Sequence, residues 1–164
     1  MSHDHTDDSS PPAEAIVELT ADEADAVGEV TESYLRAVPT GRAQPYVDLL
    51  DAIHSGTVTG PGVAILEQVC ALALETGQAR RIGLAEVETL VTNVFRRTPQ
   101  GKSRLAEVKG VNQALAQLTG QELRAAKLTW SHPGRYTLTF GVTGFDLTLV
   151  IAPDGLEVQS LTTS

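Results

Sequence analysis

The sequence predicts an α+β fold, in which about five α-helices are followed by a four-stranded antiparallel β-meander packed on them. From residue 20 to residue 120, apolar residues recur every three or four positions, which is the spacing of amphipathic helices. After Gln121 the spacing changes to alternation, and turn sequences rich in Gly and Pro separate four short segments. Helices that precede the strands, rather than alternate with them, are typical of the α+β class.

Length and composition fit one domain. The chain has 164 residues, of which 41% are hydrophobic, and this is enough to build a core. We expect a disordered acidic tail over 1–13, because this stretch has no apolar period. A single domain is expected over 14–164, with a helical part over 20–120 and the meander over 126–162.

The first helix is expected over 21–37. Thr20 and Glu23 have the spacing of a capping box, in which each side chain accepts a hydrogen bond from the other residue's backbone N–H. Pro39 ends this helix. The preceding segment, 16–19, is either a short strand or a docking segment.

Four further helices follow. The second begins after Pro45, and residues 55–62, rich in Gly, Thr and Pro, are expected to form a loop. The third begins near Pro61 and is apolar nearly all round, which predicts a central, buried helix. The fourth is expected over 84–97 and the fifth over 103–118. Short connections between the last three predict antiparallel neighbours.

The strands are expected over 127–131, 135–140, 145–151 and 156–161. Alternation gives the meander one apolar face, which we expect to pack on the third, fourth and fifth helices, and one face rich in Thr. The apolar face would carry Leu128, Trp130, Tyr136, Leu138, Phe140, Phe145, Leu147, Leu149, Ile151 and Val158.

Charge is distributed unevenly along the chain. The net charge is −9, which argues against simple attraction to nucleic acid or to an anionic membrane. Residues 1–53 hold 12 Asp and Glu against 2 Arg, whereas residues 79–127 hold 9 Lys and Arg against 4 Glu. An acidic first third beside a basic middle is the most informative global feature of the sequence.

Five cations of the basic stretch form the candidate site for an anion or a partner: Arg96, Arg97, Lys102, Arg104 and Lys109. Lys102 and Arg104 are expected near a helix start, where the helix dipole disfavours cations. An anionic partner would offset this penalty. Such a partner could be phosphate, nucleic acid, another protein or the chain's own acidic N-terminal third. The simpler interpretation is a solvated charged loop.

Other motifs are weak. Residues 101–103, Gly-Lys-Ser, do not form a P-loop, because Arg96 stands where the first Gly is needed and no strand precedes. His3 and His5 lie in a tail rich in Asp, where such residues are more often incidental than metal ligands. Cys70 lies on an apolar helix and is interpreted as a core residue. No cofactor and no metal are expected.

The sequence also indicates a location. The N-terminus lacks the basic start and apolar stretch of a signal peptide, and no run approaches the ~18 apolar residues of a membrane helix. A single cysteine gives no intrachain disulfide. We therefore expect a cytoplasmic protein without a membrane partner.

Function is left to three hypotheses. The leading one is a non-catalytic, cytoplasmic protein-interaction or regulatory module, which binds a protein partner or itself. Homodimerisation is suggested by the Thr-rich face and by the acidic segment, which could meet the basic loop of a second copy. The first alternative is nucleic-acid or phosphoanion binding through 96–109, which the net charge disfavours. The second is an enzyme or ligand-binding protein with a pocket between sheet and helices, although no catalytic motif is recognisable.

Overall fold

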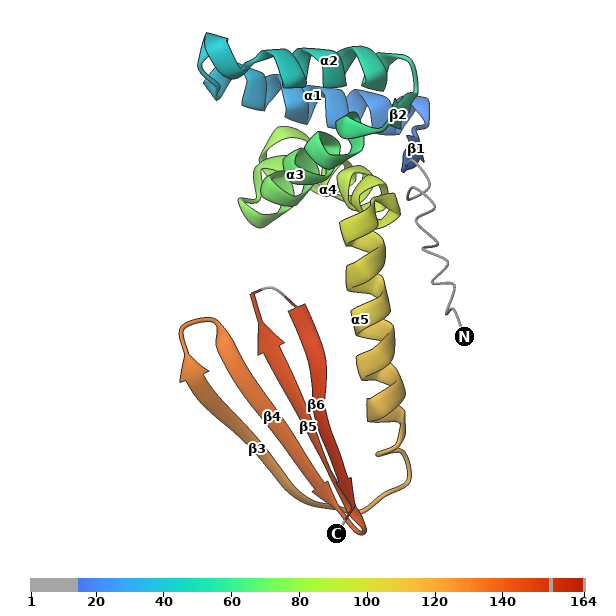
Figure 1. Cartoon of the computed structure of the whole chain (residues 1–164), viewed down its shortest axis with the longest axis vertical. Coiled ribbons are helices and arrows are strands. Elements are labelled where there is room, and N and C mark those ends of the chain that lie inside the picture. The colour runs from blue at the N-terminus through green and yellow to red at the C-terminus, as the bar shows by residue number, and fades with distance from the viewer. Residues whose placement is uncertain (1–14, 154, 164) are drawn as a thin grey trace, which may run out of the picture. The chain divides into compact units, whose positions relative to one another are not determined.

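The computed structural model describes residues 15–153 and 155–163. The chain divides into two compact units, Met1–Pro99 and Gln100–Ser164, shown in Figure 1. Apart from two short strands, the described elements are helical up to Ala116, and four strands follow. The α+β class is thus confirmed, while the expected tail over 1–13 lies outside the described residues. That the two units form one domain stays a prediction.

Four α-helices build the first unit, with a short 3-10 helix before the second. Their bounds are α1 (Ala21–Ala37), η1 (Thr40–Arg42), α2 (Gln44–His54), α3 (Pro61–Glu75) and α4 (Gln78–Arg97). The capping box is present, because the Thr20 hydroxyl accepts from the Glu23 N–H at 3.3 Å and the Thr20 N–H donates to the Glu23 carboxylate at 3.0 Å. This reciprocal pair sets the start of α1 where the sequence predicts it.

The expectation of a continuous loop over 55–62 is wrong. Residues Thr57–Thr59 form β2, which pairs antiparallel with β1 (Ile16–Glu18). Val17 and Val58 lie opposite each other, and both are buried. A Thr-Val-Thr segment has only one inward side chain, so its alternation is too short to distinguish a strand from a loop. Pairing with a segment about forty residues earlier decides the conformation.

Two helix starts are also earlier than expected. Helix α4 begins at Gln78, directly after Gly77, whose φ of 68° ends the preceding segment in the left-handed region. Helix α5 (Pro99–Ala116) begins one residue after Thr98, the last cap of α4. Proline suits the first position of a helix, since it has no N–H to satisfy there. Lys102 and Arg104 therefore lie within α5 and not in a loop.

The core of the first unit lies between its four helices and the β1–β2 pair. Helix α4 packs against α1 and α3, and α2 packs against α1 and α3. Helix α3 contributes Leu66, Val69, Cys70 and Ala73 to this core. It is not buried all round, however, because Leu72 is 40% exposed. The apolar sequence of α3 predicts more burial than the helix has, because one side that carries Leu is not covered.

The second unit consists of α5 and a four-stranded antiparallel sheet with the strand order β3-β4-β5-β6 (Figure 1). The strands are β3 (Leu123–His132), β4 (Arg135–Val142), β5 (Phe145–Ala152) and β6 (Gly155–Thr163). The register places Leu128 beside Leu138, Leu138 beside Leu149 and Leu149 beside Val158. The predicted apolar residues therefore share one face. The core of the second unit contains residues of α5, whereas packing of α3 and α4 on the sheet stays a prediction.

Candidate functional site: the open sheet face

The sheet of the second unit has one apolar face, which α5 covers only in part. The buried centre of this unit consists of Val111 from α5 with Leu147 and Leu149 from β5. Partly buried residues of α5, β4, β5 and β6 surround it: Ala114, Leu115, Leu118, Leu138, Phe140, Phe145 and Leu156. No described residue of β3 belongs to this cluster. A helix is about 10 Å wide, so one helix cannot cover four strands spaced about 4.8 Å apart.

Three large side chains that lie close together on this face, on β3 and β4, stay open to solvent. Leu128 and Trp130 are each 62% exposed, and Tyr136 is 39% exposed. Trp130 lies opposite Tyr136 in the register, and Leu128 lies two residues away on the same face. We call these three residues the open corner. They expose roughly 350 Å² of surface, which is comparable with the largest apolar patch on a typical monomeric protein.

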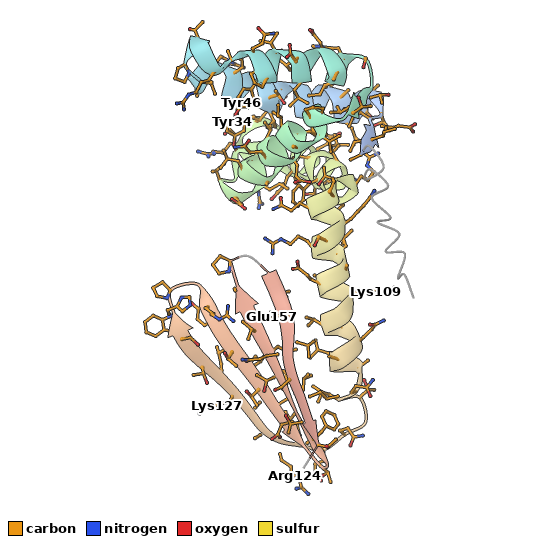
Figure 2. All side chains as sticks on the ribbon, in the orientation of Figure 1. Tyr34, Tyr46, Lys109, Arg124, Lys127 and Glu157 are labelled. Carbon is orange, nitrogen blue, oxygen red and sulfur yellow. The ribbon has the colours of Figure 1, made fainter. Side chains whose placement is uncertain are left out.

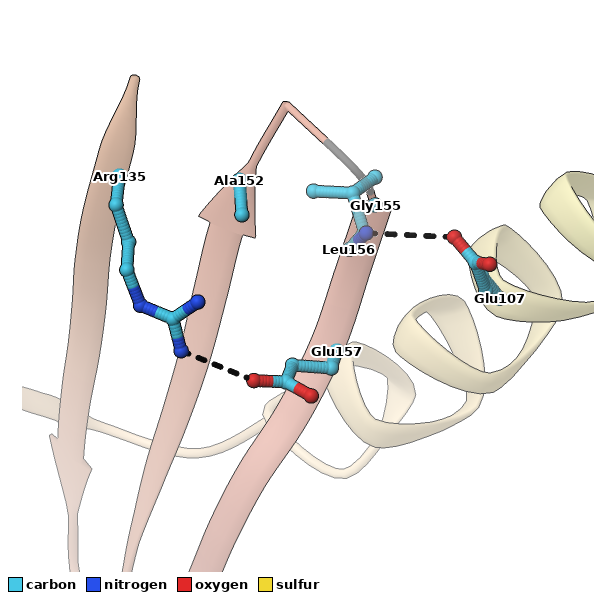
Figure 3. A pocket seen from close by; sticks show the side chains of 6 residues that line it. All are labelled: Glu107, Arg135, Ala152, Gly155, Leu156 and Glu157. Atoms are coloured by element: carbon cyan, nitrogen blue, oxygen red, sulfur yellow. Dashed lines mark hydrogen bonds and ion pairs between the residues drawn. The ribbon is translucent and has the colours of Figure 1, made fainter. Parts of the chain in front are cut away.

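The two edges of the sheet differ. All ten residues of β3 are exposed, and among the described strands β4 is the one that pairs with it. On the opposite edge, β6 has an irregularity in its pairing with β5, and its Leu156 N–H donates to the Glu107 carboxylate of α5 at 3.4 Å (Figure 3). Unpaired strand edges attract further strands, and proteins commonly protect them with bulges or covering elements. Both edge strands have irregular pairing, since β3 shifts its register with β4 between Leu123 and Ala125 and between Trp130 and His132. Edge β6 is in addition held by Glu107 of α5.

A small cavity adjoins this β6 edge, but its polar groups are engaged. It has a volume of about 220 Å³ and includes Glu107, Arg135 and Glu157 in its lining (Figure 3). Arg135 and Glu157 form an ion pair at 3.3 Å, and Glu107 lies 3.5 Å from Arg104. Ligand sites are usually larger, at about 300–1,000 Å³, with polar groups aimed at the ligand. This cavity therefore gives little support to a ligand site.

A larger groove in the first unit lies between α2 and α3, with a volume of about 490 Å³. Two of its polar side chains, Gln44 and Asp48, are hydrogen-bonded to each other at 2.7 Å. Leu49, Ala52 and Ile65 supply apolar lining. The groove is large enough for a ligand, yet it does not present the converging polar groups of a catalytic site.

The five candidate cations have different surroundings. Arg97 is engaged within the first unit, where it pairs with Glu23 at 2.6 Å and donates to the Glu18 carbonyl at 2.9 Å. Burial alone would raise the pKa of Glu23, but the bonds from Arg97 and from the Thr20 N–H outweigh it and hold this pKa below its usual value. The chain's own acidic N-terminal third is thus the partner of Arg97.

Of the remaining four, Arg96 lies in the first unit and three lie on α5. Arg104 pairs with Glu107, which in turn holds the β6 edge. At 100° per residue, Lys102 and Lys109 share the opposite side of α5, about 10 Å apart. Lys109 is seen on the side away from the sheet in Figure 2. The structure therefore does not gather the three α5 cations into one cluster.

Leu128, Trp130 and Tyr136 were expected on a face covered by helices, so the open corner was not predicted from the sequence. Alternation shows which residues share a face but not how much of that face a helix covers. The available signal was the Trp130 strand itself, which is the first strand of the meander and hence an edge strand. A large aromatic residue on an edge strand indicates a contact surface.

Other classes of site find no support in the described part of the chain. No group of three or more His, Cys, Asp or Glu side chains there could hold a metal ion. Cys70 is buried among apolar residues, as expected. Among the described helices, none is both long and apolar enough to cross a membrane. No protein-family model matches the chain, and no curated protein or solved structure matches it either.

Proposed function

We propose that this protein is a non-catalytic, cytoplasmic interaction or regulatory module, and that the open corner of its sheet binds a protein. The supporting observation is the exposure of Leu128 and Trp130 on a face whose other members form the core of the second unit. Covering this surface would remove apolar area from water, which is the main driving force of protein association. Tryptophan and tyrosine are also the residues most often found at the energetic centre of interfaces.

The small core of the second unit supports the same proposal. This unit spans 65 residues, Gln100–Ser164, and five hydrophobic residues are buried in its described part: Val111, Val142, Leu147, Leu149 and Val150. Units below about 70–80 residues rarely obtain more than a few kcal/mol from a single core, and many gain stability by association. A partner on the open corner would complete the apolar cover of the sheet.

A site-specific photo-crosslinker tests this proposal. Benzoylphenylalanine is introduced at position 130, on the open corner, and in a second variant at Thr129, on the opposite face of the same strand. Both variants are irradiated in cells of the source organism, and adducts are identified by mass spectrometry. We expect a defined adduct from position 130 and little from position 129, since neighbouring residues of a strand point to opposite faces.

Once the partner is purified, its binding to this protein should depend on the open corner. We expect Leu128→Lys to weaken its binding by about 30-fold, which is the loss of one interface hot spot. The matched control is Leu161→Lys, at an exposed leucine on the opposite edge strand. Equal adducts from positions 129 and 130, or equal binding by both Lys variants, would overturn the proposal.

Anion binding is the alternative proposal, and Lys102 and Lys109 are the cations that best fit it. Both are exposed and share one side of α5. Arg97 is unsuitable for testing this idea, because its reversal would disturb Glu23. Labelled DNA and RNA should instead be titrated at low and physiological salt against Lys102→Glu with Lys109→Glu. Binding that falls steeply with salt and is lost in this double variant would favour the alternative.

A further inference from the structure

Helix α5 carries an exposed apolar stripe beside the residues that reach the sheet. Leu105 and Val108 are both exposed, although α5 is the helix that packs on the sheet. Successive residues of a helix are about 100° apart. Leu105 therefore lies one step round the helix from Arg104, and Val108 lies one step round from Glu107. Arg104 and Glu107 both approach β6, because a side chain at Gly155 would collide with each of them.

The hand of the chain decides which way the stripe faces. Helix α5 ends near the start of β3, so it runs antiparallel to β3 and parallel to β4 (Figure 1). The two-residue turn between Val142 and Phe145 makes them a hydrogen-bonded pair, so apolar-face residues of β4 direct their backbone groups to β5. For L-residues, β3 is then on the left when the apolar face is viewed with β4 running upward. A right-handed helix running upward before this face turns each residue after a sheet-facing one to the left, toward β3.

The stripe and the open corner lie at the same level of the sheet. The register places Trp130, Tyr136, Ile151 and Leu156 in one row across the four strands. Glu107 of α5 accepts a hydrogen bond from the Leu156 N–H at the end of this row. Ile151, in the middle of the row, is exposed as well. Exposed apolar side chains of α5 and of three strands thus border one surface, which we call the docking face: Leu105, Val108, Leu128, Trp130, Tyr136 and Ile151.

The elements that bound the docking face are cationic. Three Lys and Arg residues lie in α5, two in β3 and one in β4, against one acidic residue, Glu107, although the whole chain has a net charge of −9. Glu107 is paired with Arg104. Lys102 and Lys109 are exposed and lie three residues before and four residues after Leu105, so they are its neighbours on the helix surface. Charge therefore favours an acidic occupant over a second copy of this cationic surface.

Area and width indicate that the occupant is one helix. The open corner alone would bury about 700 Å² in total with its partner, which is less than the ~1,000 Å² of a specific interface. The whole docking face exposes roughly 600 Å², so about 1,200 Å² would be buried. Strands β3 and β4 together are about 10 Å wide, which is the width of a helix, and neighbouring helices pack at about 8–10 Å.

We propose that the docking face binds an acidic, amphipathic α-helix of a different protein, which lies beside α5 across β3 and β4. This inference rests on the proposed function and specifies the chemistry of the partner. The apolar side of the bound helix covers Leu128, Trp130 and Leu105, and its carboxylates lie near Lys102 and Lys109. The bound helix completes the layer that α5 begins, since one helix cannot cover four strands.

Peptide display on the full chain tests the chemistry of the partner. A random library of peptides of about 16 residues, which is long enough for a helix, is selected at low salt on the unsubstituted chain and on Leu128→Glu. We expect peptides enriched on the unsubstituted chain to be net acidic, to have apolar residues every three or four positions and to bind more weakly as salt is added. Basic peptides, alternating peptides, or equal enrichment on both chains would overturn the proposal.

Binding of an enriched peptide should depend on both parts of the docking face. We expect Leu105→Glu and Leu128→Glu each to raise its dissociation constant at least about tenfold. Lys109→Glu should raise it about threefold, because charges at the rim of an interface contribute less. The matched controls, Leu72→Glu and Leu161→Glu, alter exposed leucines of α3 and β6 and should leave it unchanged. Unaltered binding by Leu105→Glu would show that α5 is not part of the surface.

Photo-crosslinking separates this inference from the proposed function. Benzoylphenylalanine is introduced at Leu105 and, as the control, at Ser103, since these residues flank Arg104 and point to opposite sides of α5. We expect position 105 to give an adduct with the same protein as position 130, and position 103 to give none.

The other outcomes are distinct. If position 130 gives an adduct and position 105 does not, the interaction function stands and the helix beside α5 is refuted. An adduct of position 105 with the chain itself would identify a second copy and refute a different protein as the partner. If neither position 105 nor position 130 gives a specific adduct, both proposals fail.

Discussion

The ion pair between Glu23 and Arg97 offers the sharpest test of how the first unit is held together. Arg97, at the end of α4, lies 2.6 Å from the Glu23 carboxylate at the start of α1, and the two side chains are 42% and 10% exposed. The same carboxylate caps α1 through the Thr20 N–H. Substitution of Glu23 therefore removes a helix cap and a contact between two helices at once.

The magnitudes follow from these contacts. Glu23→Gln keeps an oxygen for the Thr20 N–H but loses the charge. A hydrogen bond to a charged group contributes about 1.5–3 kcal/mol, and the partial exposure of Arg97 reduces this to about 1 kcal/mol. Glu23→Ala also loses the cap, so we expect about 2 kcal/mol. Urea unfolding at pH 7 measures both free energies, with Glu32→Gln as control, because the Glu32–Arg36 pair is exposed and 3.9 Å long.

The pH dependence has a definite sign. Because the pKa of Glu23 is lowered in the folded state, its contribution is present above the unfolded value of about 4.5 and is lost as the pH falls through the folded value. The difference between the unsubstituted chain and Glu23→Gln should thus shrink on going from pH 7 to pH 3. The reasoning is refuted if Glu23→Gln costs no more than Glu32→Gln at pH 7, or if its cost is unchanged at pH 3.

Three further predictions concern packing and backbone conformation. Burial, with a smaller effect of Glu67, raises the pKa of Cys70 to about 12, so a thiol reagent at pH 8 should label it only after unfolding; rapid labelling of the native chain would contradict its burial. Gly77→Ala should lower the free energy of urea unfolding by about 1 kcal/mol, because Gly77 has a φ of 68°. Gly110→Ala, in a helix with open space around it, should raise that free energy by about 0.5–1 kcal/mol. Changes of the same sign in both variants would contradict this reasoning. Leu147→Ala should destabilise the second unit by about 2–5 kcal/mol in thermal or urea unfolding, and equal stability of Leu147→Ala and the unsubstituted chain would show that this leucine is not in the core.

Ion pairs within the chain account for part of the charge asymmetry. From the sequence, the basic stretch could meet either the acidic segment of a second copy or the acidic N-terminal third of its own chain. In the structure, Arg97 meets Glu23 of its own chain, and Arg104 meets Glu107 on its own helix. These contacts account for part of the basic stretch without any partner. The search for a partner therefore moves from the cations to Leu128 and Trp130.

Local patterns alone determined much of this protein. The start of the first helix was predicted because Thr20 and Glu23 lie three residues apart, and its end because Pro39 follows, and both signals depend only on neighbours in the chain. The strands of the meander were recognised because alternation and turn residues are also local. For the same reason, the sequence identified which side chains share the apolar face, including Leu128 and Leu149.

Only the tertiary structure decided the contacts between distant segments. Thr57–Thr59 is a strand because β1 pairs with it, and Arg97 is structural because Glu23 lies beside it. Whether an apolar face is covered depends on how many helices reach it, and within the described part of the second unit α5 is the helix that contributes to the core of the sheet. Periodicity describes one element at a time, whereas burial depends on what packs against that element, so the exposure of Trp130 could not be read from its own strand.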